Sequence, residues 1–256
     1  MTTLQRHPIA LITGGSRGLG RSMALHLAER GVDVIFTYRA AESEANDVRE
    51  RIHALGRKAV ALRLDVTDSA SFDVFGDAVA RDLERIFERK QFDYLVNNAG
   101  TALHAGIVET TAAQLDDIYN VHFKAPFLLT QRLLPLIADG GRIVNISSGL
   151  ARMTLPGSSA YGAMKAAVET LTRYMAKEFG NRKITANVIA PGAIETDFSG
   201  GRVRDNPEVN KQIASMTALG RVGQPDDVGG AVAMLLSPES GWINAQRIEV
   251  SGGMGL

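Results

Sequence analysis

The chain has 256 residues, 28 basic and 28 acidic side chains, 45% hydrophobic residues and no cysteine. The absence of cysteine excludes disulfides, cysteine-ligated zinc, iron–sulfur clusters and a thiol nucleophile. The balanced charge argues against a nucleic-acid or anionic-membrane partner, because both attract a basic excess. A chain of this length buries a large core without cross-links, in one large domain or two small ones.

Short β-branched runs alternate with longer segments of helical periodicity. In chain order, we expect a strand at 8–13, a helix at 16–30, a strand at 33–38, a helix at 42–55, a strand at 58–64, a helix at 68–90, a strand at 93–96, a helix at 111–137, a strand at 142–146, a helix at 159–179, a strand at 184–189, a helix at 225–236 and a strand at 247–250. This alternation predicts a Rossmann-type α/β fold, with a doubly wound, seven-stranded parallel sheet and helices on both faces. The polar, glycine-rich segment at about 195–217 interrupts the alternation, and a loop of that length is usually functional or mobile.

The apolar stretches of the sequence are short, as at residues 9–12, 127–129 and 231–236. None approaches the roughly 20 residues that a membrane-spanning helix needs. Residues 1–7 contain no apolar core ahead of a cleavage site, so we expect no signal peptide. The expectation is a cytoplasmic protein without a membrane partner.

A glycine-rich loop follows the first expected strand, with the sequence Thr13-Gly14-Gly15-Ser16-Arg17-Gly18-Leu19-Gly20. Gly14 permits a sharp turn from strand to helix, Gly18 lets the backbone approach a pyrophosphate, and Gly20 lets the helix pack closely on the sheet. The N-terminus of the helix then faces the anion. Glycine turns between strands and helices are common, but this loop lies at the first junction of the alternating pattern, which favours a dinucleotide site.

The spacing T-G-x-x-x-G-x-G resembles that of the short-chain dehydrogenase/reductase family, and further motifs of the family follow in order. Asn97-Asn98-Ala99-Gly100, after the fourth expected strand, matches its N-N-A-G motif. Asp65-Val66, after the third, resembles the part of the family's site where an aspartate hydrogen-bonds the adenine amino group. The alternative for Asp65 is a cap of the next helix, although Asp68 is better placed for that. The resemblance implies a cofactor site that includes Gly14, Ser16, Arg17, Gly18, Leu19, Gly20, Asp65, Val66, Asn98, Ala99 and Gly100.

The end of the second expected strand bears on the choice of dinucleotide. In NAD-preferring members an acidic residue there binds the ribose 2′-hydroxyl. Here Tyr38 holds that place and Arg39 follows, an arrangement that accommodates a 2′-phosphate. Arg17 is a second candidate cation, so we expect NADP(H) to be preferred over NAD(H). The alternative for Arg39 is a solvated arginine at a strand end.

Tyr161 and Lys165 are four residues apart on an expected helix, so their side chains share one face. A free tyrosine has a pKa near 10, and a nearby ammonium favours the phenolate and lowers that pKa. Tyr161 would then donate a proton to a carbonyl oxygen as hydride arrives, or accept one from an alcohol. Taken alone, Y-x-x-x-K is common in helices, where a tyrosine simply packs on a lysine stem.

Two further positions complete the catalytic group that the resemblance implies. Ser148 lies thirteen residues before Tyr161, at the spacing of the family's serine that binds the substrate oxygen. Ser147 is its rival by adjacency. Asn120 matches the family's asparagine, whose backbone carbonyl binds a water leading to the lysine; the alternative is an exposed helix residue. Lys165 would also hold the nicotinamide ribose hydroxyls.

The sixth expected strand ends in a P-G segment. By resemblance, Pro191 and Gly192 flank the nicotinamide, the Ile194 backbone bonds its carboxamide, and Thr196 bonds the carboxamide or the pyrophosphate. Residues 198–217 would then form a substrate lid that orders on binding. Residues 1–256 would form a single dinucleotide-binding and catalytic domain, with the lid in place of a second domain.

The resemblance covers essentially the whole chain. It implies an NADP(H)-dependent oxidoreductase (EC 1.1.1.-) that interconverts a ketone and a secondary alcohol on a small-molecule substrate, with Tyr161 as acid or base and without a metal ion. The substrate stays open between a 3-oxoacyl thioester and, for an NAD(H)-dependent alternative, a small ketone or sugar alcohol. A catalytically silent NADP-sensing protein is a further alternative. An epimerase is disfavoured, because those chains are longer and have a different glycine spacing.

The sequence is similar to 3-oxoacyl-[acyl-carrier-protein] reductases, whose acidic partner needs a basic docking surface. A basic residue is usual where Asp139 and Gly140 stand, while Arg182 occupies the place of a second docking arginine. An acyl-carrier partner is therefore possible but not supported. The resemblance implies a homotetramer, although Ala245 replaces the family's usual glycine and Ser251 a common aspartate near an expected interface. His104 and His122 are expected to be ordinary histidines, satisfied or exposed.

Overall fold

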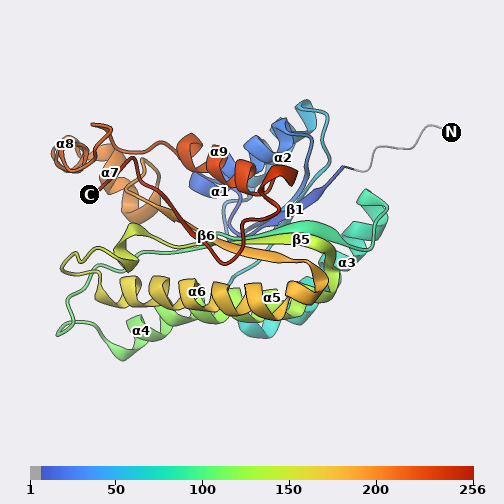
Figure 1. Cartoon of the computed structure of the whole chain (residues 1–256), viewed down its shortest axis with the longest axis horizontal. Helices are drawn as coiled ribbons and strands as arrows, with labels where there is room; N and C mark the ends of the chain where they lie inside the picture. Colours follow the sequence, from blue (N-terminus) through green and yellow to red (C-terminus); the bar gives the residue numbers. More distant parts are fainter. Residues whose placement is uncertain (1–6) are drawn as a thin grey trace.

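A parallel sheet forms the middle layer of the computed structural model, which describes residues 7–256 (Figure 1). Its strands are β1 (Ile9–Ile12), β2 (Asp33–Tyr38), β3 (Ala59–Arg63), β4 (Phe92–Asn97), β5 (Ile137–Ile146), β6 (Thr185–Pro191) and β7 (Arg247–Val250). Their order is β3-β2-β1-β4-β5-β6-β7, and all six strand pairs are parallel. This confirms the predicted doubly wound, seven-stranded sheet. The signal-peptide expectation rests on residues 1–7, of which residues 1–6 lie outside the described part.

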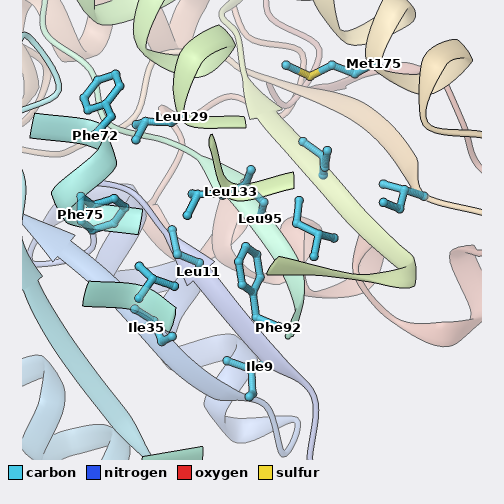
Figure 2. Close-up of a cluster of buried hydrophobic side chains, with 14 of the residues drawn as sticks. Ile9, Leu11, Ile35, Phe72, Phe75, Phe92, Leu95, Leu129, Leu133 and Met175 are labelled. Atoms are coloured by element: carbon cyan, nitrogen blue, oxygen red, sulfur yellow. The ribbon is translucent and has the colours of Figure 1, made fainter. Parts of the chain in front are cut away.

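Helices cover both faces of the sheet (Figure 1). One face carries α1 (Gly18–Glu29), α2 (Glu42–Ala54) and α9 (Pro225–Leu235), and the other carries α3 (Phe72–Phe87), α4 (Ala112–Tyr119), α5 (Ala125–Leu133) and α6 (Ser159–Glu178). The side chains of β1 alternate between the two cores, since Ile9 and Leu11 join one cluster and Ala10 and Ile12 the other. Figure 2 shows the first cluster. A strand that is buried on both faces has a continuous apolar sequence, and this pattern predicted β1.

The helix expected at 111–137 is present, but it is not one regular α-helix. The segment holds α4, a π-helix at Asn120–Lys124, α5 and a 3-10 turn at Leu134–Leu136. Pro126 has no amide hydrogen, so the α-helical bond to the His122 carbonyl cannot form. The neighbouring Ala125 amide bonds instead to the Asn120 carbonyl, five residues back. The helix therefore widens by one residue at this point, as π-bulges do.

β5 begins at Ile137, five residues before the expected strand at 142–146. Ile137 pairs with Phe92 of β4, and the register shifts between Phe92 and Tyr94. Gly140 takes the left-handed conformation at φ +78°, which glycine adopts without strain. The irregularity interrupts the hydrophobic pattern, so the sequence showed only the second half of the strand.

The segment at 195–217 is not a structureless loop. It contains a 3-10 turn at Phe198–Gly201, α7 (Arg202–Asp205) and α8 (Pro207–Ser215), at one end of the molecule in Figure 1. Asn206 caps α8, because its Oδ1 accepts from the amides of Glu208 and Val209. Thr217 forms an antiparallel bridge with Met254, which ties this segment to the C-terminal residues.

Two other expectations are refined by the structure. Asp68 caps the 3-10 turn Ser69–Ser71 that leads directly into α3, rather than α3 itself. Ala245, where the family usually has glycine, takes a left-handed φ of +60° before β7, a conformation that favours glycine. Among residues 7–256, the structure contains no helix long and apolar enough to cross a membrane.

Candidate active site

The glycine-rich loop forms a cradle at the end of β1. Gly14 and Gly18 have φ values of +70° and +54°, and a Cβ on Gly15 would lie 2.6 Å from Cβ of Phe36. A Cβ on Gly20 would overlap the carbonyl oxygen of Gly14. α1 begins at Gly18, and the preceding Arg17 makes no side-chain cap, so the first amides of α1 are left for another acceptor. The cradle fits the pyrophosphate of a dinucleotide.

The N-N-A-G turn packs directly on this loop. The Asn98 side-chain amide donates to the carbonyls of Thr13 at 2.9 Å and Gly14 at 3.1 Å. The backbone amides of Asn98 and Ala99 both donate to Oγ1 of Thr13 at 3.0 Å. A Cβ on Gly14 would lie 3.1 Å from Cα of Ala99. The structure therefore brings the Asn98–Gly100 turn to the glycine loop, as the motif order predicted.

Charged residues gather at the ends of β2 and β3. Tyr38 pairs in register with Arg63, whose Nε donates to the Arg39 carbonyl at 3.3 Å. Asp65 accepts from the amide and the hydroxyl of Thr67 at 3.0 and 2.8 Å. The bond from the Thr67 amide lowers the pKa of the Asp65 carboxyl, and the charges of Arg39 and Arg63 act in the same direction.

Arg63 was missed in the sequence. Arg63 stands at the end of the third strand, and this position indicates a role at the cofactor site only once β3 is known to lie beside β2. Val66, next to Asp65, packs against the hydrophobic core, so its side chain supports this corner of the sheet. The corner thus presents two exposed cations, Arg39 and Arg63, beside one carboxylate.

The P-G segment closes the other side of the cradle. Pro191 pairs with Val250, and a Cβ on Gly192 would lie 2.9 Å from Cα of Ser251. Ile194 forms a parallel bridge with Gly223. A Cβ on Gly18 would lie 3.6 Å from Cβ of Thr196, so Thr196 faces the glycine loop. The residues expected at the nicotinamide end therefore lie on the same side as the phosphate loop.

Ser148, Tyr161 and Lys165 meet where β5 ends against α6. Tyr161 and Lys165 are buried, and Lys165 Nζ donates to the Ile146 carbonyl at 2.7 Å and lies 5.5 Å from the Tyr161 ring centroid. Ser148 lies close enough to the Tyr161 side chain to act against the rise of the Tyr161 pKa, and its Oγ accepts from the Leu150 amide at 3.2 Å. Ser147 instead donates to Oε1 of Glu169 at 2.5 Å. Ser148, not Ser147, therefore faces the phenol.

Burial dominates the proton affinities of this group. It raises the pKa of Tyr161 to about 12, against the opposite influence of the Ser148 hydrogen bond. It lowers the pKa of Lys165 to about 7. The pKa of Tyr161 shifts in the direction opposite to the lowering expected from a nearby ammonium, because removing a phenolate from water disfavours the charged form. A neutral phenol at pH 7 is the form that donates a proton.

Asn120 and His122 both lie in the π-helix, but they differ in their surroundings. The Asn120 carbonyl accepts a hydrogen bond from the Ala125 amide. The role expected of Asn120 therefore stays a prediction. His122 is 2% exposed, with Nε2 2.7 Å from the Thr101 carbonyl and its ring centroid 5.1 Å from that of Tyr161. As expected, it is a satisfied histidine, but it contacts the proposed acid.

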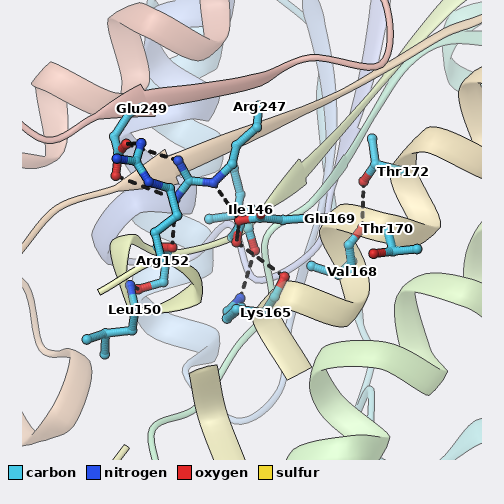
Figure 3. Close-up of polar contacts among 12 residues, drawn as sticks. Ile146, Leu150, Arg152, Lys165, Val168, Glu169, Thr170, Thr172, Arg247 and Glu249 are labelled. Carbon is cyan, nitrogen blue, oxygen red and sulfur yellow. Dashed lines mark hydrogen bonds and ion pairs between the residues drawn. The ribbon is translucent and has the colours of Figure 1, made fainter. Parts of the chain in front are cut away.

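Figure 3 shows a cluster of four alternating charges, formed by Glu169, Arg247, Glu249 and Arg152. Arg247 pairs with Glu169 at 2.7 Å and with Glu249 at 3.0 Å, and Arg152 pairs with Glu249 at 2.7 Å. Arg247 also donates from Nη2 to the Ser148 carbonyl at 3.3 Å. This cluster joins α6, β7 and the turn after β5, and no sequence motif pointed to it.

Apolar side chains line the outer side of the site. The Phe198 ring centroid lies 6.1 Å from that of Tyr161, with the ring planes tilted by 53°. A cavity of about 220 Å³ is lined by Met153, Met254 and Leu256 together with Arg152 and Glu249. His104 Nε2 lies 3.2 Å from Oγ of Ser199, so the loop after β4 touches the 195–217 segment.

Comparison with known proteins gives consistent matches over nearly the whole chain. A family model described as enoyl-(acyl carrier protein) reductase matches residues 14–255. A hydroxynaphthalene reductase-like protein from Metarhizium brunneum is 36% identical over 261 residues, covering 96% of this chain and 94% of its own length. Tetrahydroxynaphthalene reductase PfmaG from Pestalotiopsis fici is 35% identical, covering 96% of this chain and 90% of its own.

Solved structures agree with these relatives. The reductase LugOII, which catalyses keto-reduction at C1 during lugdunomycin biosynthesis, superposes with a TM-score of 0.91 at 39% identity, over 96% of both chains. The angucycline C-6 ketoreductase LanV with bound NADP gives 0.92 at 33% identity, over 97% of this chain and 95% of its own. The chain belongs to the short-chain dehydrogenase/reductase family. It is an NAD(P)-dependent oxidoreductase of that family.

Proposed function

We propose that this protein reduces a ketone on a planar, polycyclic aromatic substrate to a secondary alcohol, with NADPH as the reductant. The observation that carries the proposal is the Phe198 ring beside the Tyr161 phenol, because an aromatic wall at the proton donor favours a flat aromatic substrate. The names of the relatives support it, since they include reductases of hydroxynaphthalenes and of an angucycline.

The proposed mechanism assigns one task to each side chain. NADPH supplies a hydride to the carbonyl carbon. Ser148 holds the carbonyl oxygen by a hydrogen bond and stabilises its developing charge. Tyr161 donates its phenolic proton to that oxygen, which completes the alcohol. Lys165, anchored by one N–H to the Ile146 carbonyl, keeps its other donors for the ribose hydroxyls and steadies the phenolate.

The proton affinities favour the reductive direction. Burial raises the pKa of Tyr161 to about 12, so the phenol is protonated at neutral pH and ready to donate. Alcohol oxidation needs the phenolate before the reaction begins, and burial disfavours that form. We therefore expect ketone reduction to be faster than alcohol oxidation near pH 7.

The cofactor site supports a preference for NADP(H) over NAD(H). Arg39 and Arg63 lie at the ends of neighbouring strands, and Arg17 lies in the glycine loop. A 2′-phosphate carries about two negative charges and three strong acceptor oxygens, which suit a cluster of guanidinium groups. The neutral Tyr38 holds the place of the acid that would bind a 2′-hydroxyl.

Arg182 argues against an acyl-carrier thioester as substrate. Its guanidinium pairs with Asp139 at 2.7 Å and donates to the carbonyls of Leu134 at 2.9 Å and Ile137 at 2.5 Å. These contacts hold the irregular start of β5. An arginine so occupied has few donors left for an acidic partner, so its position in the sequence does not support docking of a carrier protein.

We also propose one catalytic domain, a lid and a homotetramer. One continuous sheet spans the described residues, which supports a single dinucleotide-binding domain with 195–217 as the substrate lid. Leu115, Tyr119, Phe127 and Tyr174 are large apolar side chains exposed on α4, α5 and α6. An apolar set on neighbouring helices suits contact with another copy.

The test is NADPH oxidation with a panel of carbonyl compounds and with NADH as the alternative cofactor. The panel contains hydroxylated tetralones and naphthoquinones, small diketones, acetoacetyl thioesters and sugars. We expect the highest kcat/KM for the bicyclic and larger aromatic compounds with NADPH. A preference for acetoacetyl thioesters or sugars would contradict the substrate proposal. Tight NADPH binding with no turnover of any compound would favour an NADP-sensing protein.

A further inference from the structure

His122 is the strongest unassigned feature of the site. It lies in the π-helix at Asn120–Lys124, and α6, which carries Tyr161 and Lys165, packs against this segment. Because Pro126 cannot donate to the His122 carbonyl, the helix widens here and the imidazole is carried inward. A buried histidine needs a hydrogen-bond partner, and the structure supplies one from a neighbouring loop.

That partner is the turn after β4, which forms one wall of the cofactor site. His122 Nε2 lies 2.7 Å from the Thr101 carbonyl and 3.4 Å from the Thr101 amide nitrogen, and the shorter contact is a hydrogen bond when Nε2 carries the proton. A Cβ on Gly100 would lie 3.1 Å from Cε1 of the ring, so the N-N-A-G turn packs flush against the imidazole. The ring therefore joins the π-helix to the loop that Asn98 fastens to the glycine cradle.

The same ring contacts the proposed proton donor. The centroids of His122 and Tyr161 are 5.1 Å apart and the planes meet at 84°, an edge-to-face contact. Phe198 lies on the phenol as well, at 6.1 Å, and Lys165 Nζ lies 5.5 Å from its centroid. Tyr161 is thus confined by Lys165 of its own helix and by His122 and Phe198 from two other parts of the chain. Of these three residues, His122 is the one that hydrogen-bonds the loop after β4.

We propose that His122 is a positioning residue: its hydrogen bond to Thr101 fixes the imidazole, and the imidazole holds the Tyr161 phenol against Ser148. The proposal rests on the proposed function, since it assigns Tyr161 as the proton donor. In this arrangement the π-helix contributes His122 to the site in addition to Asn120, whose carbonyl accepts from the Ala125 amide. An error of about 1 Å in the placement of a reacting group is enough to cost about a hundredfold in rate.

The variants separate the hydrogen bond from the packing. His122→Gln keeps a donor that reaches Thr101, His122→Phe keeps the ring edge without a donor, and His122→Leu keeps neither. Val121→Ala is the matched control, because it truncates the adjoining buried residue of the same π-helix. The fraction of folded protein is measured for each variant by chemical unfolding, and activity is expressed per folded enzyme.

We expect His122→Leu and His122→Phe to lower kcat at least about tenfold with the KM for NADPH within about twofold, and His122→Gln to stay within about threefold of wild type. We expect Val121→Ala to lower stability more than activity per folded enzyme. Equal losses of kcat in His122→Gln and His122→Leu would overturn the proposal.

A second measurement needs no substrate, and so separates this inference from the proposed function. In protein labelled with ¹³C at the tyrosine Cζ, the signal that disappears in Tyr161→Phe is that of Tyr161. Ser148→Ala shifts this signal by removing its hydrogen-bond partner. We expect His122→Leu to shift it in the same direction and His122→Gln to leave it near the wild-type position. An unshifted signal in His122→Leu would overturn the positioning role even if no ketone substrate were known.

Discussion

Arg247 of β7 and Glu169 of α6 form an ion pair of 2.7 Å directly behind the serine of the active site. Both side chains are largely buried, and Arg247 also reaches the Ser148 carbonyl at 3.3 Å. Ser147 donates to the same Glu169 oxygen at 2.5 Å. The two adjacent serines are thus fixed from behind by one ion pair, which leaves the Ser148 hydroxyl directed at the phenol.

Removing one partner of this pair leaves a largely buried charge without compensation. We expect Arg247→Met to lower the free energy of unfolding by about 2 kcal/mol and to reduce kcat, because the Ser148 turn loses its anchor. The measurement is urea unfolding together with steady-state kinetics. Arg152→Met is the control, since Arg152 is 63% exposed and its pair with Glu249 contributes little to stability. Equal losses in the two variants would contradict this account.

The cofactor preference depends on cations at the ends of β2 and β3. We expect Arg39→Ala and Arg63→Ala each to raise the KM for NADPH about tenfold or more, because a charge-assisted bond to a phosphate contributes about 1.5–3 kcal/mol. The KM for NADH should change little. Arg51→Ala, which removes an exposed charge from α2, controls for net charge. Equal effects of Arg39→Ala on both cofactors would show that it does not bind the 2′-phosphate.

The aromatic wall at Phe198 sets the proposed preference for flat substrates. We expect Phe198→Ala to raise the KM for a bicyclic aromatic ketone about tenfold, and that for a small aliphatic ketone about twofold or less, because stacking and burial of a ring are lost. Met216→Ala is a matched control, since Met216 lies in the same segment and is 49% exposed against 43% for Phe198. A uniform effect on both ketones would argue for a general role in lid folding.

The buried imidazole of His122 makes the free energy of unfolding depend on pH. Burial, reinforced by the charge of Lys165, lowers the pKa of His122 to about 3, from an ordinary value of 6.5. Between these values the unfolded chain binds a proton that the folded chain does not, so the free energy of unfolding falls as pH falls through this window. As pH falls, we expect the free energy of unfolding to decrease more steeply in wild type than in His122→Gln. The two slopes should differ by up to about 1.4 kcal/mol per pH unit.

Urea unfolding at several pH values between 7 and 4 measures this slope. His53→Gln is the control, because His53 is exposed on α2 and should leave the slope as it is in wild type. The interpretation fails if His122→Gln and wild type lose stability in parallel over this range.

The alternation of strands and helices was readable because each element has its own period and length. β1 is a continuous apolar run, β2 is apolar at its centre, and α1 and α6 carry apolar residues at helical spacing. The motifs at Gly14–Gly20 and at Tyr161 with Lys165 were readable because their chemistry depends on local spacing. The structure places these motifs at one end of the sheet.

What the sequence did not show depends on contacts between distant segments. The early start of β5 follows from a register shift against β4. The π-helix at Asn120–Lys124 is different, because its cause is local: the missing amide hydrogen of Pro126 indicates an irregular helix from the sequence alone. Arg63 acquires meaning only beside Tyr38, and Glu169 only opposite Arg247, 78 residues away. His122 was expected to be an ordinary histidine, because nothing local revealed that its ring would meet Tyr161.

The central claim is that the Tyr161 phenol donates the proton that completes ketone reduction. Tyr161→Phe keeps the ring and its contacts with His122 and Phe198 but removes that proton. We expect single-turnover reduction of a hydroxylated tetralone to slow by at least about a hundredfold, while the Kd for NADPH, measured by fluorescence titration, stays within about twofold. A Tyr161→Phe enzyme that binds NADPH and reduces the ketone at a rate near that of wild type would contradict the account.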